Sequence, residues 1–351
     1  MIDIRVYGAK ADGITDCSVA INQAILADDI ILQNGIFLIS ESIKIPSNRT
    51  VYGKNAKLKL ADGAYDNFFR NSDFTNGNVN VNFKGLGNFI LDGNTINNIE
   101  ANPFNSVKCY TTHGFNSSES YKYTAATFKK VNGFEISGII ISDRPHVALG
   151  GVRNSNGVYD NIYLDYKTET LNQDGITIGW GSHDITINNI RGWCGDDFFA
   201  FNAGDRGGFM DSTLFHSAYT TGDIYNIDID NIKVFRELYH LYIIICGDGN
   251  KVHDISFNDV LINYCGGVLY TGYTSFRTVA PAKEDIEDIT MDNVLVKTMR
   301  EDHRAAFQLG EDCQNITITN FTNESEEPDF AVDTEGLDII NFTINGTGYP
   351  T

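Results

Sequence analysis

A short motif of alternating hydrophobic and polar residues recurs along the chain. It reads hydrophobic-x-hydrophobic-x-Asn/Asp, and a further hydrophobe often follows it. The copies, the first two of them weaker, lie at 134–138, 162–165, 185–189, 227–231, 255–259, 289–293, 316–320 and 340–344. Their central hydrophobes are about 25 to 42 residues apart. A repeat of this kind, built from short strands, is typical of a solenoid.

This pattern predicts coils of β-strand that stack on one another. Alternation with a period of two turns one face of each strand inward. One short strand cannot bury that face alone, so successive coils must share an interior. The Asn or Asp suits a corner, because its short polar side chain tolerates left-handed backbone angles and could form a ladder of hydrogen bonds with the next coil. The alternative is a β-sandwich of unrelated strands, which does not require a corner at regular spacing.

A second family of strands alternates with the first. Its members are hydrophobic segments near 146–150, 174–179, 197–202, 240–245, 267–271 and 304–309. Each coil therefore has at least two strands, and we expect a third within the turns. The predicted fold is all-β: a single-stranded, right-handed parallel β-helix that forms one domain over 1–351. We expect an N-terminal strand and capping helix over 1–30, coils over 31–321, and a last coil or C-terminal cap over 322–351.

The N-terminal segment predicts the capping helix. Asp16 or Ser18 is placed to cap it, and its Ala20, Ile21 and Ala24 share one face. A helix across the open end of a solenoid shields the core and blocks pairing of the edge strand.

Composition limits the classes of function. The 351 residues are 42% hydrophobic, which suffices for a long core. The net charge of −20 argues against nucleic-acid binding. It also disfavours a polyanionic substrate, unless a cation or a local basic cluster screens the repulsion. No apolar run is long enough for a membrane span, and no secretory signal opens the sequence, so we expect a trimmed signal or assembly into a virus particle. The six cysteines lack metal-type spacing, and we interpret them as small buried hydrophobes.

Three aspartates form the main candidate site. Asp174 precedes Gly175, and Asp196 and Asp197 lie 22 and 23 residues further on, which is about one coil. Neighbouring strands in a sheet are roughly 4.8 Å apart, so the three carboxylates should converge on one surface patch. Carboxylates this close favour a protonated acid beside an ionised base, which is what glycoside hydrolysis needs. The alternative is that they are turn residues on a solvated corner.

Several segments resemble the pectate-lyase superfamily of β-helix proteins. They are 4–26, with its Gly-Ala-Lys-Ala-Asp-Gly-Ile-Thr-Asp run, and 31–39, 45–53 and 89–94. That superfamily includes polysaccharide hydrolases, lyases, epimerases and bacteriophage tailspikes. The resemblance therefore implies the fold and does not by itself choose an activity.

The aspartate segments resemble family 28 glycoside hydrolases, the polygalacturonase-like group, whose catalytic strands read Asn-Thr-Asp-Gly and Gly-Asp-Asp. This chain has Asn172-Gln-Asp174-Gly and Gly-Asp196-Asp197. The resemblance implies that Asp196 is the general acid. It implies that Asp174 and Asp197 position and activate the attacking water, with inversion, and that Asn172 contacts the substrate.

The chain departs from family 28 at two motifs. The family's Gly-His-Gly follows the aspartate pair by about one coil, and here His216 stands at that distance without the glycines. We take His216 as a catalytic candidate. The family's Arg-x-Lys, which grips the substrate carboxylate, would fall at Ile243 and Ile245. The missing cations favour a neutral or differently charged sugar. Arg206, in an insertion over 203–222, is a candidate replacement cation.

Further side chains are candidates for contact with the sugar. His240 falls in the same strand column as Asp174 and Asp197, and could bond to a carboxylate or a substrate hydroxyl. Aromatic rings stack on sugars, although many of those spaced near this surface must instead pack in the core. An excursion over 100–130 would form one wall of the groove. The residues we assign to substrate binding, besides Asn172 and Arg206, are His146, Trp180, Asn202, His240, Tyr242 and Tyr270.

The leading interpretation is an extracellular or virion-associated glycoside hydrolase whose partner is a bacterial or plant polysaccharide. It requires no cofactor and no metal, and it predicts a monomer, or a homotrimer if the protein resembles a tailspike. The second is a non-catalytic glycan-binding or virion-adhesion protein on the same scaffold, which the missing cations and glycines favour. The third is a Ca²⁺-dependent polysaccharide lyase, because clustered Asp residues can hold that metal. No clear Arg or Lys base lies among these strands.

Overall fold

The computed structural model describes residues 1–98, 124–144, 146–167, 173–203, 222–236, 239–246, 249–271, 285–300, 305–309, 313–325, 332–333 and 340–348. Residues 204–221 of the expected insertion over 203–222, and most of the expected excursion over 100–130, lie outside the described residues. So do the candidates Asn172, Arg206 and His216.

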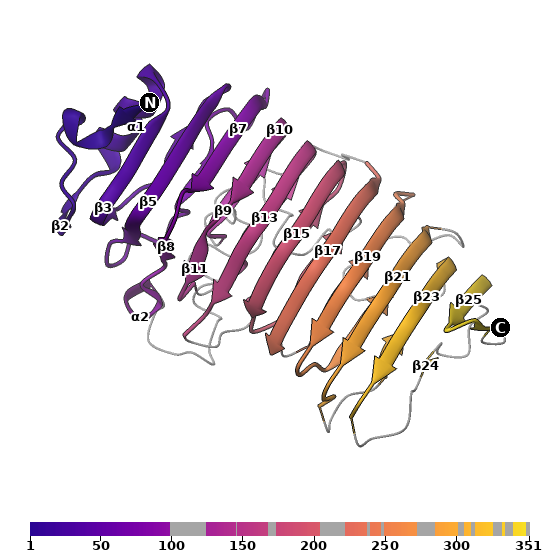
Figure 1. Ribbon diagram of the computed structural model, residues 1–351. Coiled ribbons are helices and arrows are strands. Elements are labelled where there is room, and N and C mark those ends of the chain that lie inside the picture. Colours follow the sequence, from indigo (N-terminus) through magenta and orange to yellow (C-terminus); the bar gives the residue numbers. More distant parts are fainter. Residues whose placement is uncertain are drawn as a thin grey trace.

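The described strands form two sheets that run the length of the molecule, from the N-terminal to the C-terminal end (Figure 1). Within each sheet, every described pair of neighbouring strands is parallel, except β25 with β26, which is antiparallel. This arrangement confirms the predicted parallel β-helix.

The long sheet follows the order β1 (Ile2–Asp3), β3 (Ile30–Ile39), β5 (Arg49–Leu60), β7 (Asn78–Gly85), β10 (Val131–Ser137), β13 (Ser155–Asp165), β15 (His183–Trp193), β17 (Ile224–Arg236), β19 (Val252–Ile262), β21 (Ile286–Val296), β23 (Cys313–Asn323), β25 (Ile340–Ile344) and β26 (Thr347–Gly348). Beside that path it includes β2 (Asp12–Asp16), β8 (Phe89–Asp92) and β11 (Ile140–Ser142). The short sheet follows the order β24 (Val332–Asp333), β22 (Phe307–Gln308), β20 (Gly267–Thr271), β18 (His240–Ile245), β16 (Phe199–Asn202), β14 (Ile176–Gly179), β12 (Leu149–Val152), β9 (Ala126–Lys129), β6 (Phe69–Asn71) and β4 (Ile43–Ile45).

The core lies between the two sheets and is continuous along the stack. Alternate residues of each strand point into it: Ile185 and Ile187 from the long sheet, and Phe199 and Phe201 from the short sheet, are all buried. Burying side chains of this size stabilises the fold by about 1.5 to 3 kcal/mol each. The five described cysteines are buried free thiols within the same coils, as expected.

Asn and Asp residues with left-handed backbone angles form two ladders along the long sheet. One ladder ends the sequence motif, as predicted, at Asn189, Asn231, Asp259, Asn293 and Asn320. Asn161 continues this ladder on β13, where Gly157 and Tyr159 pair with Ile185 and Ile187, so the copy expected over 162–165 lies over 157–161 instead. The other immediately precedes the motif, at Asn156, Asp184, Asn226, Asp254, Asp288, Asn315 and Asn341. Within the first, Asn231 Nδ2 donates to Asn189 Oδ1 at 2.5 Å, and Asn189 Nδ2 donates to Asp160 Oδ1 at 2.7 Å.

These ladders correct one expectation. The third strand of each coil does not lie within the turns. It is the second half of each long strand, beyond the left-handed residue at which the strand bends: β15, for example, continues from Asn189 to Trp193.

Replacing Asn231 with Ala is expected to lower the free energy of unfolding by about 1 to 3 kcal/mol. A left-handed conformation costs a residue with a Cβ roughly 1 to 2 kcal/mol, and a lost hydrogen bond adds about 1 kcal/mol. Asn231→Gly also removes the hydrogen bond but tolerates φ of 53°, so it should cost less. Urea unfolding of both variants measures the difference. Equal losses would show that the left-handed angle is not a source of strain there.

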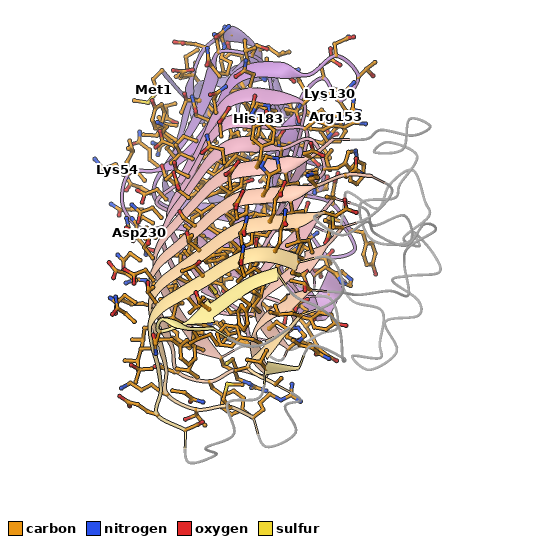
Figure 2. All side chains as sticks on the ribbon, turned by 90° about the vertical axis from the view of Figure 1, so that its right-hand side faces the viewer. Met1, Lys54, Lys130, Arg153, His183 and Asp230 are labelled. Atoms are coloured by element: carbon orange, nitrogen blue, oxygen red, sulfur yellow. The ribbon has the colours of Figure 1, made fainter. Side chains whose placement is uncertain are left out.

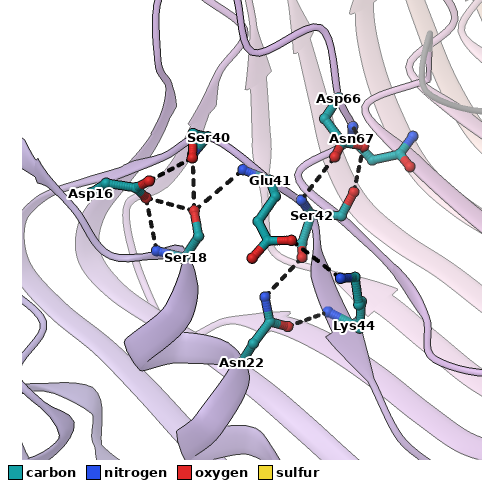
Figure 3. Close-up of polar contacts among 9 residues, drawn as sticks. All are labelled: Asp16, Ser18, Asn22, Ser40, Glu41, Ser42, Lys44, Asp66 and Asn67. Carbon is teal, nitrogen blue, oxygen red and sulfur yellow. Dashed lines mark hydrogen bonds and ion pairs between the residues drawn. The ribbon is translucent and has the colours of Figure 1, made fainter.

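The N-terminal cap is tied to the first coil by polar contacts (Figure 3). The helices are η1 (Ile4–Tyr7), α1 (Ser18–Ala27) and, further on, α2 (Thr95–Asn98). The Asp16 carboxylate accepts hydrogen bonds from the Ser18 N–H at 2.9 Å and from the Ser40 hydroxyl at 2.5 Å. The N-cap of α1 is Cys17, and not Asp16 or Ser18 as expected. The Asp16 carboxylate nevertheless binds the first N–H of α1 and links the helix to the end of β3. None of the helices within the described ranges is long and apolar enough to cross a membrane.

Candidate functional site

Asp174, Asp197 and His240 lie one above another at the corner where the chain enters the short sheet. The register of β14 with β16, and of β16 with β18, places them at matching positions on consecutive coils. The backbone confirms the alignment, because Gly175 N–H donates to the Asp197 carbonyl at 3.0 Å and Phe198 N–H donates to the His240 carbonyl at 2.9 Å. The predicted strand column is therefore present.

The three carboxylates converge beside this column. One carboxylate oxygen from each of Asp174, Asp196 and Asp197 lies within 4.8 Å of the others. Asp174 and Asp196 are partly exposed, whereas Asp197 is 9% exposed. The first two can thus reach a ligand, while the third is mainly enclosed by protein. Three oxygens at this spacing could also hold a hard cation such as Ca²⁺.

His240 is fixed beside Asp197 by two hydrogen bonds to that residue and by packing on its neighbours. Its Nδ1 lies 3.0 Å from Asp197 Oδ1, and its backbone N–H donates to the same oxygen at 3.1 Å. The imidazole ring stacks on the Tyr270 ring with centroids 4.9 Å apart. Gly267 lies under the ring, and a Cβ at that position would come within 2.8 Å of His240 Cδ2. An ionised Asp197 requires the proton on Nδ1, which leaves Nε2 as an acceptor when the ring is neutral.

Buried side chains hold the backbone of the site. The Tyr166 hydroxyl bonds to the carbonyls of Asp174 at 3.3 Å and His146 at 3.4 Å. Burial raises the pKa of Tyr166 well above its ordinary value, so the hydroxyl stays a donor. Cys194 Sγ donates to the Asp196 carbonyl at 3.1 Å. These residues gave no signal in the sequence, because a phenol or thiol in a turn looks like any packing residue.

The outer face of the short sheet next to the carboxylates is uncharged. Thr177, Ala200 and Tyr270 occupy outward positions on β14, β16 and β20 that follow the column. Tyr270 packs on Ala200, and the Thr177 hydroxyl donates to Asp174 Oδ2 at 3.3 Å. Thr177 and Ala200 are buried, at 0% and 3% exposure, so among these three residues the partly exposed Tyr270 ring is the one that a sugar could contact.

Two residues assigned to substrate binding lie away from the carboxylates. Trp180 and Asn202 are at the far ends of β14 and β16, five or six residues beyond Asp174 and Asp197, or roughly 16 to 20 Å along the strands. Both are nearly buried, at 5% and 7% exposure. His146 is also mainly buried, on the coil before Asp174. The structure does not bring Trp180 or Asn202 to the cluster.

The assignment of Tyr242 to substrate binding is wrong. Its side chain is fully buried in the core, where its ring packs on Phe201 at 4.7 Å and Phe257 at 4.4 Å between centroids. Tyr242 pairs with Phe199, which points inward, so the alternation of the strand directs both rings into the interior.

The histidine of the site is His240. It lies on the coil that follows the aspartate pair in the stack, which is where family 28 carries its Gly-His-Gly. His216, the catalytic candidate of the sequence analysis, lies outside the described residues and stays a prediction. On the next coil, β20 reads Gly267-Val-Leu-Tyr-Thr and contains no Lys or Arg.

Residues 1–194 match the family described as Rhamnogalacturonase A/epimerase, pectate lyase-like. A curated relative, the preneck appendage protein of Bacillus phage PZA, is 27% identical over 224 residues, which is 54% of this chain and 26% of that protein. The chain thus spans about a quarter of the length of that relative.

Solved structures share the fold. A family 28 exopolygalacturonase of Yersinia enterocolitica aligns with a TM-score of 0.64 and 14% identity, over all of this chain and 79% of the other. The N-terminal fragment of bacteriophage phi29 gene product 12 aligns with a TM-score of 0.50 and 17% identity, over 99% of this chain and 73% of the other. Identities this low support a common architecture and no more.

Proposed function

The chain belongs to the rhamnogalacturonase A/epimerase family of pectate-lyase-like proteins, and on that premise we propose that it is a glycoside hydrolase that cleaves a polysaccharide. The observation that carries the proposal is the convergence of Asp174, Asp196 and Asp197 within 4.8 Å, with His240 bonded to Asp197. The phage relative favours a virion-associated site of action for the whole protein.

The proposed reaction assigns one task to each carboxylate. Asp196, which is partly exposed, protonates the glycosidic oxygen as its bond to the anomeric carbon breaks. Asp174 and Asp197 hold a water molecule whose oxygen attacks that carbon, and one of them takes up the released proton. His240 holds Asp197 in position through Nδ1.

The sugar at the cleaved bond is proposed to be neutral. The uncharged, partly exposed ring of Tyr270 beside the carboxylates supports this, as does the lack of Lys and Arg on β20. A uronate carboxylate placed there would face three aspartates with no cation on the neighbouring strands to offset the repulsion.

The stereochemistry is a separate question. The family resemblance implies inversion, whereas oxygens within 4.8 Å of one another are nearer to the carboxyl spacing of about 5 to 5.5 Å in retaining enzymes. We propose inversion. A proton NMR time course shows which anomer of the product forms first and thus distinguishes inversion from retention. Initial formation of the retained anomer would contradict inversion.

The second candidate is a non-catalytic glycan-binding appendage. The phage relative, which is named as an appendage protein, favours it. On this proposal the aspartates would bond to sugar hydroxyls without cleavage.

The wild-type protein should release reducing ends from at least one polymer in a panel of neutral, uronate and bacterial capsular polysaccharides. Products with unmodified sugar masses by mass spectrometry would indicate hydrolysis. Unsaturated products that vanish with a chelator would indicate the lyase. Binding of a glycan without any product would contradict the hydrolase and favour the appendage.

A further inference from the structure

Gln173 is a fully buried polar residue that links three consecutive coils beside the carboxylates. Its side-chain Nε2 donates to the Arg144 carbonyl at 2.5 Å, on the coil that precedes it. Its own backbone carbonyl accepts the Gly195 N–H at 3.0 Å, on the coil that follows. Gln173 immediately precedes Asp174, and Gly195 immediately precedes Asp196. The two hydrogen bonds therefore act on the backbone that carries both of these aspartates.

The link continues to one further coil through a buried guanidinium. Arg144 is 2% exposed, and its Nη2 donates to the Thr124 carbonyl at 3.0 Å. It is the one Lys or Arg that is buried within the described part of the chain. The register of β9, β12, β14 and β16 stacks the corners of Thr124, Arg144, Gln173 and Gly195 in that order. We call these four residues the buried strut.

The carboxylates beside the buried strut repel one another. One oxygen from each of Asp174, Asp196 and Asp197 lies within 4.8 Å of the others, and ionised groups at this spacing push apart the coils that carry them. His240 holds the side chain of Asp197. The buried strut joins the same coils by hydrogen bonds on the side away from water, where solvent does not compete for them. It therefore opposes the repulsion at the backbone of Asp174 and Asp196.

Gln173 is also a position at which the chain departs from family 28. The family reads Asn-Thr-Asp-Gly where this chain reads Asn-Gln-Asp-Gly over 172–175. A Thr hydroxyl stays close to its own backbone, whereas the longer Gln side chain reaches the carbonyl on the preceding coil. The contact with Arg144 is thus a property of this chain and does not come from the resemblance.

From these contacts we propose that Gln173 is a positioning residue for the hydrolysis, which holds Asp174 and Asp196 at the separation that the reaction requires. The inference rests on the proposed function, because it takes these carboxylates to act on a glycosidic bond. The Gln173 side chain is fully buried, so it does not reach the sugar. Its loss should therefore change the rate of the bound complex and not the affinity for the substrate.

Gln173→Met keeps the length of the side chain and removes the N–H donor. We expect kcat to fall by about 10²-fold, the loss that a misplacement of about 1 Å can cause, while KM stays within about twofold of the wild type. Deuterium exchange at the Gly195 amide needs no substrate, and it should become about tenfold faster as the Gln173 carbonyl loosens. Gln173→Asn, whose amide is too short for the bond to Arg144, is the second variant if Gln173→Met does not fold.

The matched control is Asn154→Leu. Asn154 is 2% exposed and also joins two coils, because its Nδ2 donates to the Phe128 carbonyl at 2.9 Å. It follows the opposite end of β12 from the corner of the carboxylates. The control should lower the thermal midpoint as Gln173→Met does, but leave kcat and the exchange at Gly195 unchanged.

An unchanged kcat in Gln173→Met, a rise in KM alone, or an equal loss of kcat in Asn154→Leu would overturn the proposal. An unchanged exchange rate at Gly195 would also overturn it. A wild type that releases no reducing ends would instead contradict the hydrolase, and the exchange rate would still show whether Gln173 holds the backbone of the cluster.

Discussion

Asp196→Asn is expected to lower turnover by about 10³-fold while leaving the fold intact. The amide has nearly the shape of the carboxyl but cannot deliver the proton that the leaving oxygen needs. Asp196 is partly exposed, and Cys194 holds it through its backbone carbonyl, which the substitution keeps. Reducing-end release under substrate saturation measures the loss, and the thermal midpoint should stay within a few degrees of the wild type.

Asp230→Asn is the matched control. Asp230 lies on β17, on the outer face of the long sheet, and the substitution removes the same charge (Figure 2). It should retain wild-type turnover. If Asp196→Asn were nearly as active as Asp230→Asn, Asp196 would not be the acid, and the carboxylate cluster would serve binding or structure.

The repeat was predictable because its causes are local. A left-handed corner admits few residue types, so Asn or Asp recurs at Asn189, Asn231 and Asn293 and can be read without knowledge of the fold. The second ladder could have been found in the same way, since Asp184 and Asn226 immediately precede their motifs. The alternation of Ile185 and Ile187 likewise determines which face is buried.

The site was harder to predict because it depends on which coils become neighbours. Asp174 and Asp197 were placed correctly, since only an ordinary coil separates them. Between Asp197 and His240 lies the insertion over 203–222, and a count of residues cannot tell an insertion from a strand. His240 was nevertheless expected in this column, and its expected bond to a carboxylate is confirmed by the contact with Asp197. His216 lies outside the described residues and stays a prediction.

Tyr242 shows a second limit on what can be predicted from the sequence. Its ring could have stacked on a sugar, and only the pairing of β18 with β16 reveals that it shares the inward position of Phe199. One residue of register decides between the core and the surface. The partners of the site backbone, such as Tyr166, lie on the preceding coil and depend on packing that no local pattern specifies.

His240→Ala is expected to lower turnover by about 10²-fold, and Gly267→Ala by about tenfold through the same ring. The first removes the imidazole that bonds to Asp197 Oδ1 and leaves the backbone N–H bond to the same oxygen. The second adds a methyl group 2.8 Å from His240 Cδ2, too close for the ring to keep both its stack on Tyr270 and its bond to Asp197. Gly267 has no left-handed angle, so Ala fits its backbone.

The double variant tests whether these two losses have one cause. If Gly267 acts only by leaving room for the imidazole, then Gly267→Ala should cost little further once His240 is Ala, because the imidazole is gone and the nearest remaining atom is the Ala305 carbonyl oxygen at 3.3 Å. The turnover numbers of the wild type, the two single variants and the double variant are compared in a double-mutant cycle. Thermal midpoints confirm that each variant is folded. A tenfold loss that persisted in the His240→Ala background would mean that position 267 affects the reaction by another route, such as contact with the sugar.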